Sequence, residues 1–357
     1  MLKVFTKIES VQKQWGSIKI PDFLNINFLQ VYYQNHPHVK HLFVMNTDMR
    51  LYAHIFKITF NKTKNYLKSN SVANIFLSFI NFDVLYLTNS YITNVPAFIS
   101  NKAINLKQLL NTIKHNYSLI VIPDFLFEKM IVEDDNYTKI EVEQEMVLDI
   151  RINWSGLEDY ISDLKKKYRN KVKSIIKQTN NLEIRNLDSN DLEVYAIDMQ
   201  TLFNQVARSS RFKGPEFNTA SFGSFVSQGF MSVDGYFLND KLVGFSSEIH
   251  KQEMLYSYFV GFDKSLNKSF PIYGRILLES ITRAIKLKKE RLILGRTANE
   301  FKSNFGAYPI KSFVYLKVEN RFLRAVLRPI YSKLSVSKWI MRNPLKSKTN
   351  SKGSFSF

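Results

Sequence analysis

The chain has 357 residues and a formal charge of +19, is 45% hydrophobic and 14% aromatic, and holds 12 Gly, 9 Pro and no Cys. This aromatic content excludes a disordered protein, and the scarcity of Gly and Pro excludes a collagen-like one. Without cysteine there is no disulfide, thiolate nucleophile or thiolate metal site, and at roughly 150 residues per domain the length predicts two domains.

The first half of the chain is predicted to combine strands with a helix. Its β-branched and aromatic runs predict strands at 41–45, 51–60, 84–87 and 119–122, and a helix is expected at 106–114. Asn46-Thr47-Asp48 separates the first two strands and indicates a hairpin. The order strand, helix, strand favours an α/β layer over a helical bundle.

The second half is predicted to open with a long basic helix over 156–180. Ser155-Gly-Leu-Glu158 has the form of a capping box, in which each side chain satisfies a free backbone N–H at the helix start. Apolar side chains then recur at spacings of three and four, at Leu157, Tyr160, Ile161, Leu164, Tyr168, Val172 and Ile176. The lysines fall mainly on the other faces, so we expect the helix to lie on a core with its basic surface outward.

A meander of three strands and the helix after it form the centre of the second half. The predicted elements are a helix at 192–207, strands at 235–238, 242–250 and 254–262, a helix at 275–288, a strand at 291–294, a short helix at 298–305 and a strand at 313–318. This layout brings a helix N-terminus, with its free N–H groups, to the end of a central strand. It therefore predicts an anion site around Lys268 and Gly274, with a plain polar loop as the alternative.

The last part of this half carries a resemblance to a known family. The block Leu294-Gly-Arg-Thr-Ala-Asn-Glu-Phe-Lys-Ser-Asn-Phe-Gly-Ala307, together with 159–170, 241–245 and 256–261, resembles bacterial GNAT-type acyltransferases of the two-domain FemAB-like and BioF2-like (peptidoglycan-biosynthesis-like) branch. The resemblance covers most of the chain. It implies an α/β (α+β) fold of two tandem GNAT-like domains, each a mixed, mostly antiparallel sheet flanked by helices. The expected domains are 1–150 and 151–320, followed by a basic amphipathic tail at 321–357.

The same resemblance implies an N-acyltransferase that uses an acyl-CoA-type co-substrate, a small-molecule or peptide amine as acceptor, and no metal. The donor would follow the central strand to the helix N-terminus and contact Ser257, Phe259, Val260, Gly261, Lys264, Asn267, Lys268, Tyr273 and Gly274. Lys268-Ser-Phe-Pro-Ile-Tyr-Gly274 stands where CoA-binding members carry a glycine-rich loop. An aminoacyl-tRNA donor, as in Fem-type transferases, is therefore the alternative.

Two candidate catalytic residues lie on the meander. Glu248 is the candidate base, because a strand carboxylate whose pKa is raised by burial can accept the proton of an amine. Tyr258, or Tyr256, is the candidate acid that protonates the leaving group. The alternatives are a salt-bridged surface carboxylate for Glu248 and core aromatic rings for the two tyrosines.

Six polar residues are candidates for holding the acceptor, namely Arg208, Arg211, Arg296, Thr297, Lys302 and Ser303. Arginine offers a two-pronged contact to a carboxylate or phosphate, and lysine offers a point charge. The alternatives are that Arg296 pairs with Glu300 to fix a turn, and that Arg208 and Arg211 lie in a solvated loop.

The positive charge is concentrated in two segments. Eight bases and one acid lie between Lys165 and Arg185, and nine bases and no acid lie between Arg321 and Phe357. Such segments suit an anionic membrane surface or tRNA, and a non-catalytic module that binds one of these is the rival function. No stretch reaches the roughly 20 apolar residues of a membrane span, so we expect a cytoplasmic protein, with peripheral contact at the inner membrane face left open.

The two functions differ in the structure that they predict. The enzyme is expected to have a splayed pair of central strands with an open cleft above Gly274, and the non-catalytic module is expected to have this cleft filled.

Overall fold

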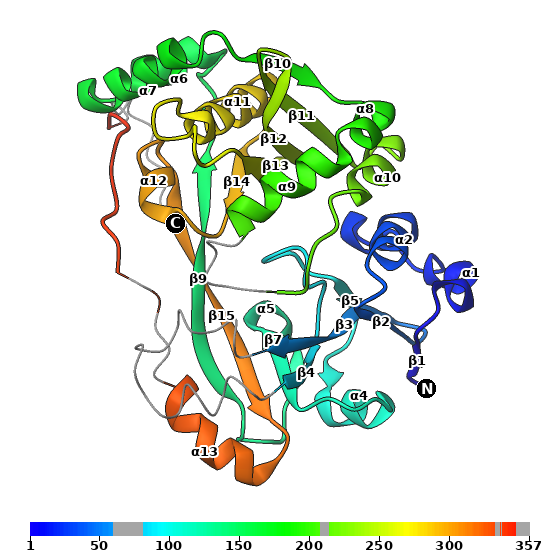
Figure 1. Ribbon diagram of the computed structural model, residues 1–357. Coiled ribbons are helices and arrows are strands. Elements are labelled where there is room, and N and C mark those ends of the chain that lie inside the picture. The colour runs from blue at the N-terminus through cyan, green and yellow to red at the C-terminus, as the bar shows by residue number, and fades with distance from the viewer. Residues whose placement is uncertain (60–80, 208–213, 333–335, 337, 348–357) are drawn as a thin grey trace.

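The computed structural model describes residues 1–59, 81–207, 214–332, 336 and 338–347. Its centre is a 13-stranded mixed sheet flanked by helices, which confirms the α/β class expected from the sequence. In the view of Figure 1 the N-terminal strands lie in the lower part and the C-terminal strands in the upper part, with β9 and β15 running between them.

The N-terminal half contains most of the short elements. It comprises β1 (Lys3–Phe5), α1 (Gln12–Trp15), α2 (Ile26–Asn35), β2 (Lys40–Met45), β3 (Met49–Thr59), β4 (Asn81–Tyr86), β5 (Phe98–Ser100), β6 (Ile104–Asn105), α4 (Leu106–Thr112), β7 (Leu119–Pro123), α5 (Asp124–Phe127), β8 (Met130–Ile131) and β9 (Thr138–Asp149). The predicted hairpin is present, because β2 and β3 pair antiparallel around Asn46-Thr47-Asp48.

The C-terminal half contains the meander and the longest helices. It comprises α6 (Leu157–Asp163), α7 (Lys166–Gln178), β10 (Glu183–Asn186), α8 (Ser189–Val194), α9 (Ala196–Ala207), α10 (Ser221–Ser227), β11 (Met231–Leu238), β12 (Lys241–His250), β13 (Met254–Phe262), α11 (Ile272–Lys286), β14 (Arg291–Gly295), α12 (Asn299–Ser303), β15 (Tyr308–Val318) and α13 (Arg321–Tyr331). The order of strands and helices after residue 230 is the predicted one.

The two halves repeat one arrangement of strands and exchange their last strand. In each half three antiparallel strands are followed by a parallel one, β2-β3-β4 with β7 and β11-β12-β13 with β14. The next strand of the large sheet then crosses over, so that β9 pairs with β14 and β15 pairs with β7. β9 and β15 also pair with each other. We call this crossing the β9–β15 exchange. It joins the halves by strand pairing, and the division of the chain at residue 150 stays a prediction.

A bulge marks the place where β9 passes from one half to the other. Val142 pairs with Ser312 and Glu145 pairs with Ile310, so Glu143 and Gln144 oppose a single residue of β15. After the bulge β9 continues beside β14. A bulge of this kind bends its strand and shifts which side chains face which side. Charged and apolar residues alternate from Lys139 to Glu143 but not beyond the bulge, and no strand is predicted here from the sequence.

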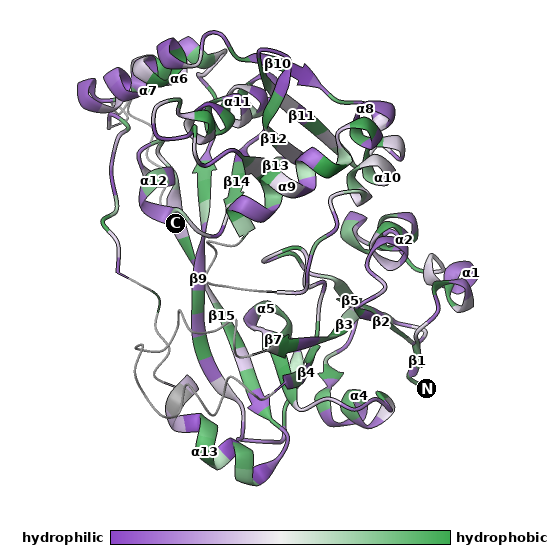
Figure 2. Cartoon of the chain, viewed as in Figure 1, coloured by the Kyte–Doolittle hydropathy of each residue, from purple (hydrophilic) through white to green (hydrophobic). Residues whose placement is uncertain are grey.

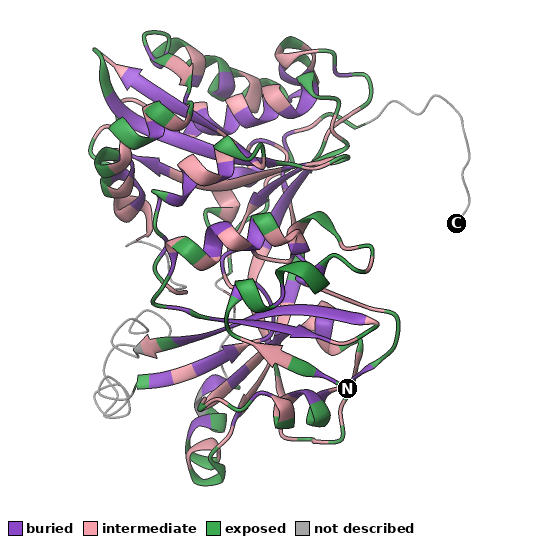
Figure 3. Cartoon of the chain, turned by 90° about the vertical axis from the view of Figure 1, so that its right-hand side faces the viewer, coloured by how far each residue is buried: buried purple, intermediate pink, exposed green. Residues whose placement is uncertain are grey.

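A hydrophobic core extends through both halves on one face of the sheet. Phe28 and Tyr32 of α2 pack their rings 5.2 and 5.0 Å from that of Phe225 on α10, and Phe245 of β12 belongs to the same cluster. In the C-terminal half a second cluster, which includes Ile281 of α11, is formed with α6 and α7. Figure 2 shows the apolar colouring along the strands, and Figure 3 shows these strands buried between helices with exposed outer faces.

The basic helix predicted over 156–180 is two helices. α6 ends at Asp163 and α7 begins at Lys166, because Leu164 and Lys165 are extended, with ψ of 142° and 147°. The N–H of Lys165 donates to the carbonyl of Pro344, 2.8 Å away, so the C-terminal segment 338–347 packs against the break. The predicted capping box is absent, since the N–H of Ser155 donates to Asp159 and no side chain caps α6.

Other boundaries also differ from the predictions. The helix expected at 192–207 is split at Tyr195 into α8 and α9, and β11 begins at Met231, four residues before the predicted start. α13 contains Pro329, and proline normally interrupts a helix, but α13 ends two residues later, so few hydrogen bonds are lost. None of the helices described is long and apolar enough to cross a membrane.

Close contact between β13 and α9 depends on Gly261. A Cβ at this position would lie 2.7 Å from the backbone nitrogen of Phe203 and 2.9 Å from the carbonyl carbon of Leu202. These atoms belong to the α9 main chain and cannot move aside as a flexible side chain can. The absence of a side chain at Gly261 therefore lets α9 pack directly on the sheet.

We expect Gly261→Ala to lower the free energy of unfolding by about 1 to 3 kcal/mol, because the added methyl group overpacks this contact. Urea unfolding measures the change. The matched control is Gly223→Ala in α10, where an added Cβ meets nothing within 4 Å and where alanine is the better helix former. Equal stability of the two variants would contradict the close contact.

Candidate functional site

β13 and β14 separate partway along their length. They pair in parallel only through Met254–Tyr256 and Arg291–Ile293. On the other side of β13, Ser246 pairs with Val260 and Glu248 with Ser257, so Tyr258 and Phe259 form a bulge opposite Ser247. The Ser247 hydroxyl donates to the Phe259 carbonyl at 2.9 Å and accepts from the Phe259 N–H at 3.0 Å. The bulge bends β13, and from Ser257 onward β13 has no paired strand on the β14 side within the described residues.

The expected splay is therefore present, but the space above Gly274 is filled. Tyr273 stacks on Phe262 at 5.3 Å and on Phe301 at 5.4 Å between ring centroids. The ammonium group of Lys171, on α7, lies 5.0 Å from the centroid of the Phe301 ring. A Cβ at Gly274 would lie 2.9 Å from the side chain of Ile175. Aromatic rings and α7 thus close the end of the gap where an open cleft was expected.

The N-terminus of α11 does not form the predicted anion site. The helix begins at Ile272, whose N–H donates to the Phe270 carbonyl at 2.7 Å. The next N–H, from Tyr273, donates to the Asn267 side chain at 2.9 Å. Asn267 therefore acts as a cap for this N–H, and Lys268 is exposed. With these two donors already used, the residues here do not fit the pyrophosphate of coenzyme A.

A tight turn at the end of β14 forms the other side of the gap. Gly295, Thr297 and Ala298 all have positive φ, of 68°, 69° and 50°. The ammonium group of Lys302 donates to the carbonyls of Gly295 at 3.1 Å and Arg296 at 2.8 Å. Left-handed backbone at non-glycine residues is unfavourable and persists only where surrounding contacts enforce it. We call residues 295–298 the β14 turn, and Lys302 is the side chain that holds it.

Lys302 is buried beside two carboxylates. Its side chain is 3% exposed, and burial lowers its pKa to about 7, although Glu145 and Glu143 act in the opposite direction. Burial raises the pKa of Glu145, which accepts a hydrogen bond from the Thr93 hydroxyl at 3.1 Å. Burial therefore shifts the two pKa values in opposite directions, and it disfavours the charged form of both side chains.

Arg296 connects the β14 turn to the N-terminal half. Its guanidinium donates to the Asn94 side chain at 3.0 Å, and its buried Nε has no hydrogen-bond partner among the described residues. It does not pair with Glu300, the alternative considered from the sequence, because Glu300 pairs with Arg342. Thr297 is exposed, and the Ser303 hydroxyl donates to the Glu300 carbonyl at 2.8 Å.

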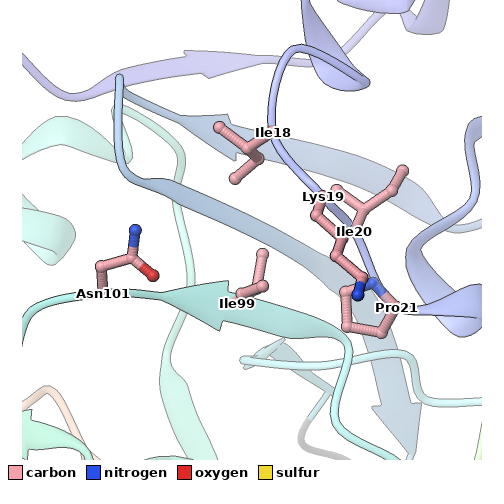
Figure 4. A pocket seen from close by; sticks show the side chains of 6 residues that line it. All are labelled: Ile18, Lys19, Ile20, Pro21, Ile99 and Asn101. Carbon is pink, nitrogen blue, oxygen red and sulfur yellow. The ribbon is translucent and has the colours of Figure 1, made fainter.

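A cavity of about 260 Å³ borders the β14 turn. Its lining residues are Glu143, Thr297, Ala298, Asn299, Glu300, Phe301, Val336 and Trp339. A cavity of about 430 Å³ lies elsewhere, in the N-terminal half, lined by Ile18, Lys19, Ile20, Pro21, Ile99 and Asn101. Figure 4 shows the latter between the segment before α2 and β5, and its mostly apolar lining holds no carboxylate or histidine. Of these two cavities, the smaller one adjoins the candidate site.

The two candidate catalytic residues lie on opposite faces of the sheet. Glu248 forms an ion pair with Arg283 of α11 at 3.1 Å, and Arg283 also pairs with Asp234. Burial raises the pKa of Glu248, while Arg283 opposes the shift. Tyr258 faces α2, where its hydroxyl lies 2.9 Å from that of Tyr32. The structure does not bring the two together, and their catalytic roles stay predictions.

The remaining candidates are divided between core and surface. Phe259 packs against Phe203 and Phe217, and Val260 lies against a core cluster. The N–H of Lys264 donates to the side chain of Gln205 at 3.0 Å. Arg208 and Arg211 lie outside the described residues.

Glu143, Glu145, Thr93 and Asn94 surround the β14 turn but are absent from the candidates drawn from the sequence. A signal exists for Glu143, because Lys139, Glu141 and Glu143 alternate with Ile140 and Val142. Nothing local marks Thr93 or Asn94, which lie in a loop of the other half. Asn94 contacts Arg296 of the turn, and Thr93 contacts Glu145 of β9.

Comparison with known proteins supports the fold. No protein-family model matches the chain, and no curated protein matches it. A solved structure of a conserved protein of unknown function from Bacteroides thetaiotaomicron shares 12% identity, over 89% of this chain and 100% of that one, with a TM-score of 0.51. The structure of FemX shares 10% identity, over 86% of this chain and 94% of that one, with a TM-score of 0.48. A probable N-acyltransferase from Enterococcus faecalis shares 10% identity, over 89% of this chain and 73% of that one, with a TM-score of 0.45. At these identities the likeness is one of fold. A GCN5-related N-acetyltransferase from Kribbella flavida also stands among the matches, with a TM-score of 0.43.

We expect Arg283→Leu to lower the free energy of unfolding by about 3 to 5 kcal/mol, because it leaves the buried carboxylates of Glu248 and Asp234 without their counter-charge. Adding Glu248→Gln should recover part of this loss, since one buried charge is then removed. Urea unfolding of the two single variants and the double variant forms the cycle. Additive losses would mean that Glu248 is not held by Arg283.

A second prediction concerns pH and Lys302. The unfolded lysine keeps its proton up to about 10.5, whereas the folded one releases it at about 7. The unfolded state therefore binds more protons between these values, and stability rises with pH across this window and is flat below it. Lys302→Met removes that dependence. Urea unfolding at about pH 6 and pH 9 should show that the free energy of unfolding of the wild type, relative to that of Lys302→Met, is larger at the higher pH. The difference between the wild type and Lys286→Met, on the surface of α11, should be the same at both pH values.

Proposed function

We propose that the chain is an acyltransferase that moves an acyl group from an activated carrier to an amine. The observation that carries the proposal is the splay of β13 and β14 beyond Tyr256 and Ile293. From Ser257 to Phe262, one edge of β13 faces no strand in the part of the chain that the structure describes. An extended carrier arm that contains amides can add to such an edge through main-chain hydrogen bonds.

The reaction requires positioning more than side-chain chemistry. The amine nitrogen forms a bond to the carbonyl carbon, and the bond from this carbon to the sulfur or oxygen of the carrier breaks. The amine loses one proton, and the leaving group gains one. Main-chain N–H groups on an open strand edge are suited to stabilise the negative charge that develops on the carbonyl oxygen.

The β14 turn is the proposed acceptor side of the gap. It borders the smaller cavity, and Lys302 and Arg296 place two bases beside Glu143 and Glu145. Lys302 donates to two carbonyls of the turn, so we assign it as a positioning residue. Glu143, whose Oε2 is buried without a hydrogen-bond partner among the described residues, is the carboxylate available to an incoming ammonium group.

Two classes of donor remain within this proposal. An acyl-CoA-type donor is the first, with its arm along Ser257–Phe262, although α11 does not supply a pyrophosphate site. An aminoacyl-tRNA is the second, and the position of α7 favours it. Lys171 of α7 contacts Phe301 at the end of the gap, and Lys166, Lys167 and Lys173 on the same helix are exposed. A polyanionic carrier could follow this basic surface.

The test is a transfer assay with two donor panels, acyl-CoA esters and aminoacyl-tRNAs, each combined with a panel of amines and followed by mass spectrometry of the N-acylated product. Product from acyl-CoA supports the first donor, and product from tRNA alone supports the second. No product from either panel would overturn the proposal and leave the non-catalytic module as the function.

A variant that fills the gap sharpens this test. Gly295 has a φ of 68°, and a Cβ there would lie 4.0 Å from the carbonyl oxygen of Ser257 on β13. Asparagine tolerates positive φ, so Gly295→Asn should fold while its side chain enters the gap. We expect a fall in kcat/KM of at least about tenfold, or roughly 1.4 kcal/mol of transition-state free energy. The matched control is Gly229→Asn, whose φ is 71° and whose surroundings are open. Equal activity of the two variants would place the donor elsewhere.

A further inference from the structure

α13 presents an apolar surface to solvent. The helix spans 11 residues, Arg321–Tyr331, after the end of β15. Leu327 and Tyr331 are buried, at 5% and 8% exposure, and attach the helix to the protein. Phe322 and Val326 are 81% and 53% exposed. These two residues are four apart and therefore lie together on one side of the helix.

Basic side chains flank this apolar pair. Arg321 and Arg328 are exposed, whereas Arg324 is partly buried and donates to the Val318 carbonyl at 3.0 Å. Between residues 321 and 357 the sequence contains no acid. The nearest preceding acid, Glu319, is paired with Lys317 at 3.1 Å. We define the α13 face as Arg321, Phe322, Ala325, Val326 and Arg328.

The α13 face lies at one extremity of the molecule. Figure 1 shows α13 at the lower end of the view, beyond the ends of β9 and β15. Figure 2 shows hydrophilic and hydrophobic residues side by side on this helix. α13 therefore lies away from the meander β11–β13 and the helices around it.

We propose that the α13 face docks the protein on an anionic phospholipid bilayer. Phe322 and Val326 would enter the boundary between headgroups and acyl chains, and Arg321 and Arg328 would contact the lipid phosphates. Short helices with an apolar stripe and flanking bases lie in the membrane interface in this manner. The proposal is independent of the acyl-transfer reaction, since none of these residues adjoins the gap between β13 and β14.

RNA is a poorer match for the same surface. A single-stranded nucleic acid is held by several aromatic side chains on which successive bases stack. The α13 face offers one phenylalanine, and its other apolar side chains, Ala325 and Val326, are aliphatic. Their exposure is explained by insertion among acyl chains and not by contact with phosphate or ribose.

The experiment is co-sedimentation of the full chain with vesicles of phosphatidylcholine, prepared with or without phosphatidylglycerol. We expect binding only with phosphatidylglycerol, and weaker binding as salt is added, because the arginines act through charge. Replacing Phe322→Ser and Val326→Ser together should weaken binding by about tenfold or more, since two large apolar groups no longer leave water.

Matched control variants distinguish binding through the α13 face from nonspecific adsorption to vesicles. Val194→Ser with Ile197→Ser removes an apolar pair that is at least as exposed on average, at 75% and 83%, on α8 and α9 and should leave vesicle binding unchanged. For charge, Arg321→Glu with Arg328→Glu should abolish binding, whereas Lys173→Glu with Lys177→Glu on α7 should not. All four altered positions in α13 are exposed, and unchanged thermal melting would show that the variants fold.

Three results would overturn the proposal. The first is retention of the wild type by neither kind of vesicle, and the second is equal vesicle binding by the two apolar double variants. The third is that wild type binds tRNA but no vesicles and loses the tRNA on Arg321→Glu with Arg328→Glu, which would assign the surface to RNA. None of these outcomes bears on the transfer assay, so the two proposals fail separately.

Discussion

The pairing of β9 with β14 and of β15 with β7 is the constraint on which the rest of the structure depends. Each half lacks its last strand until the other half provides it, so the halves cannot separate without breaking the sheet. This fixes the N-terminal loop that carries Thr93 and Asn94 against the β14 turn of the C-terminal half. A site whose groups come from both halves then needs no separate device to hold them in register, because strand pairing sets their positions.

The same exchange explains why a lysine can be buried beside the gap. β9 bulges at Glu143 and Gln144 as it changes halves, and it places Glu145 near Lys302. Without these carboxylates, burial would lower the lysine pKa still further and leave its ammonium form without a partner. The carboxylates favour the charged form of Lys302, which donates hydrogen bonds to two carbonyls of the β14 turn. The turn depends on such contacts because its left-handed backbone is unfavourable. The β14 turn ends β14, so that β14 separates from β13. One edge of β13 is therefore left without a partner strand.

Local patterns were enough to predict most strands and helices but not the contents of the site. The hairpin at residues 46–48 and the meander strands follow from residue periodicity, which needs no knowledge of distant contacts. Glu248 and Tyr258 show the limit. Because Glu248 pairs with Ser257, Tyr258 must point to the opposite face, but this register depends on a bulge that no local pattern marks. Burial of Glu145 and Lys302 likewise depends on contacts between segments more than 150 residues apart, which periodicity within one segment cannot reveal.

The two basic helices lie at opposite ends of the molecule, with α7 at the upper end and α13 at the lower end in Figure 1. Charges screened over about 10 Å cannot act as one field across that separation, so each helix requires its own partner. α7 borders the filled end of the gap through Lys171 and Phe301, and its lysines are therefore placed to attract an anionic carrier to the donor side. α13 has no contact with the gap but adds exposed apolar side chains to its arginines, which a soluble anion would not use. If both proposals hold, a chain docked through α13 would keep its donor side turned away from the bilayer, and a soluble carrier could reach the gap while the protein remains on the membrane.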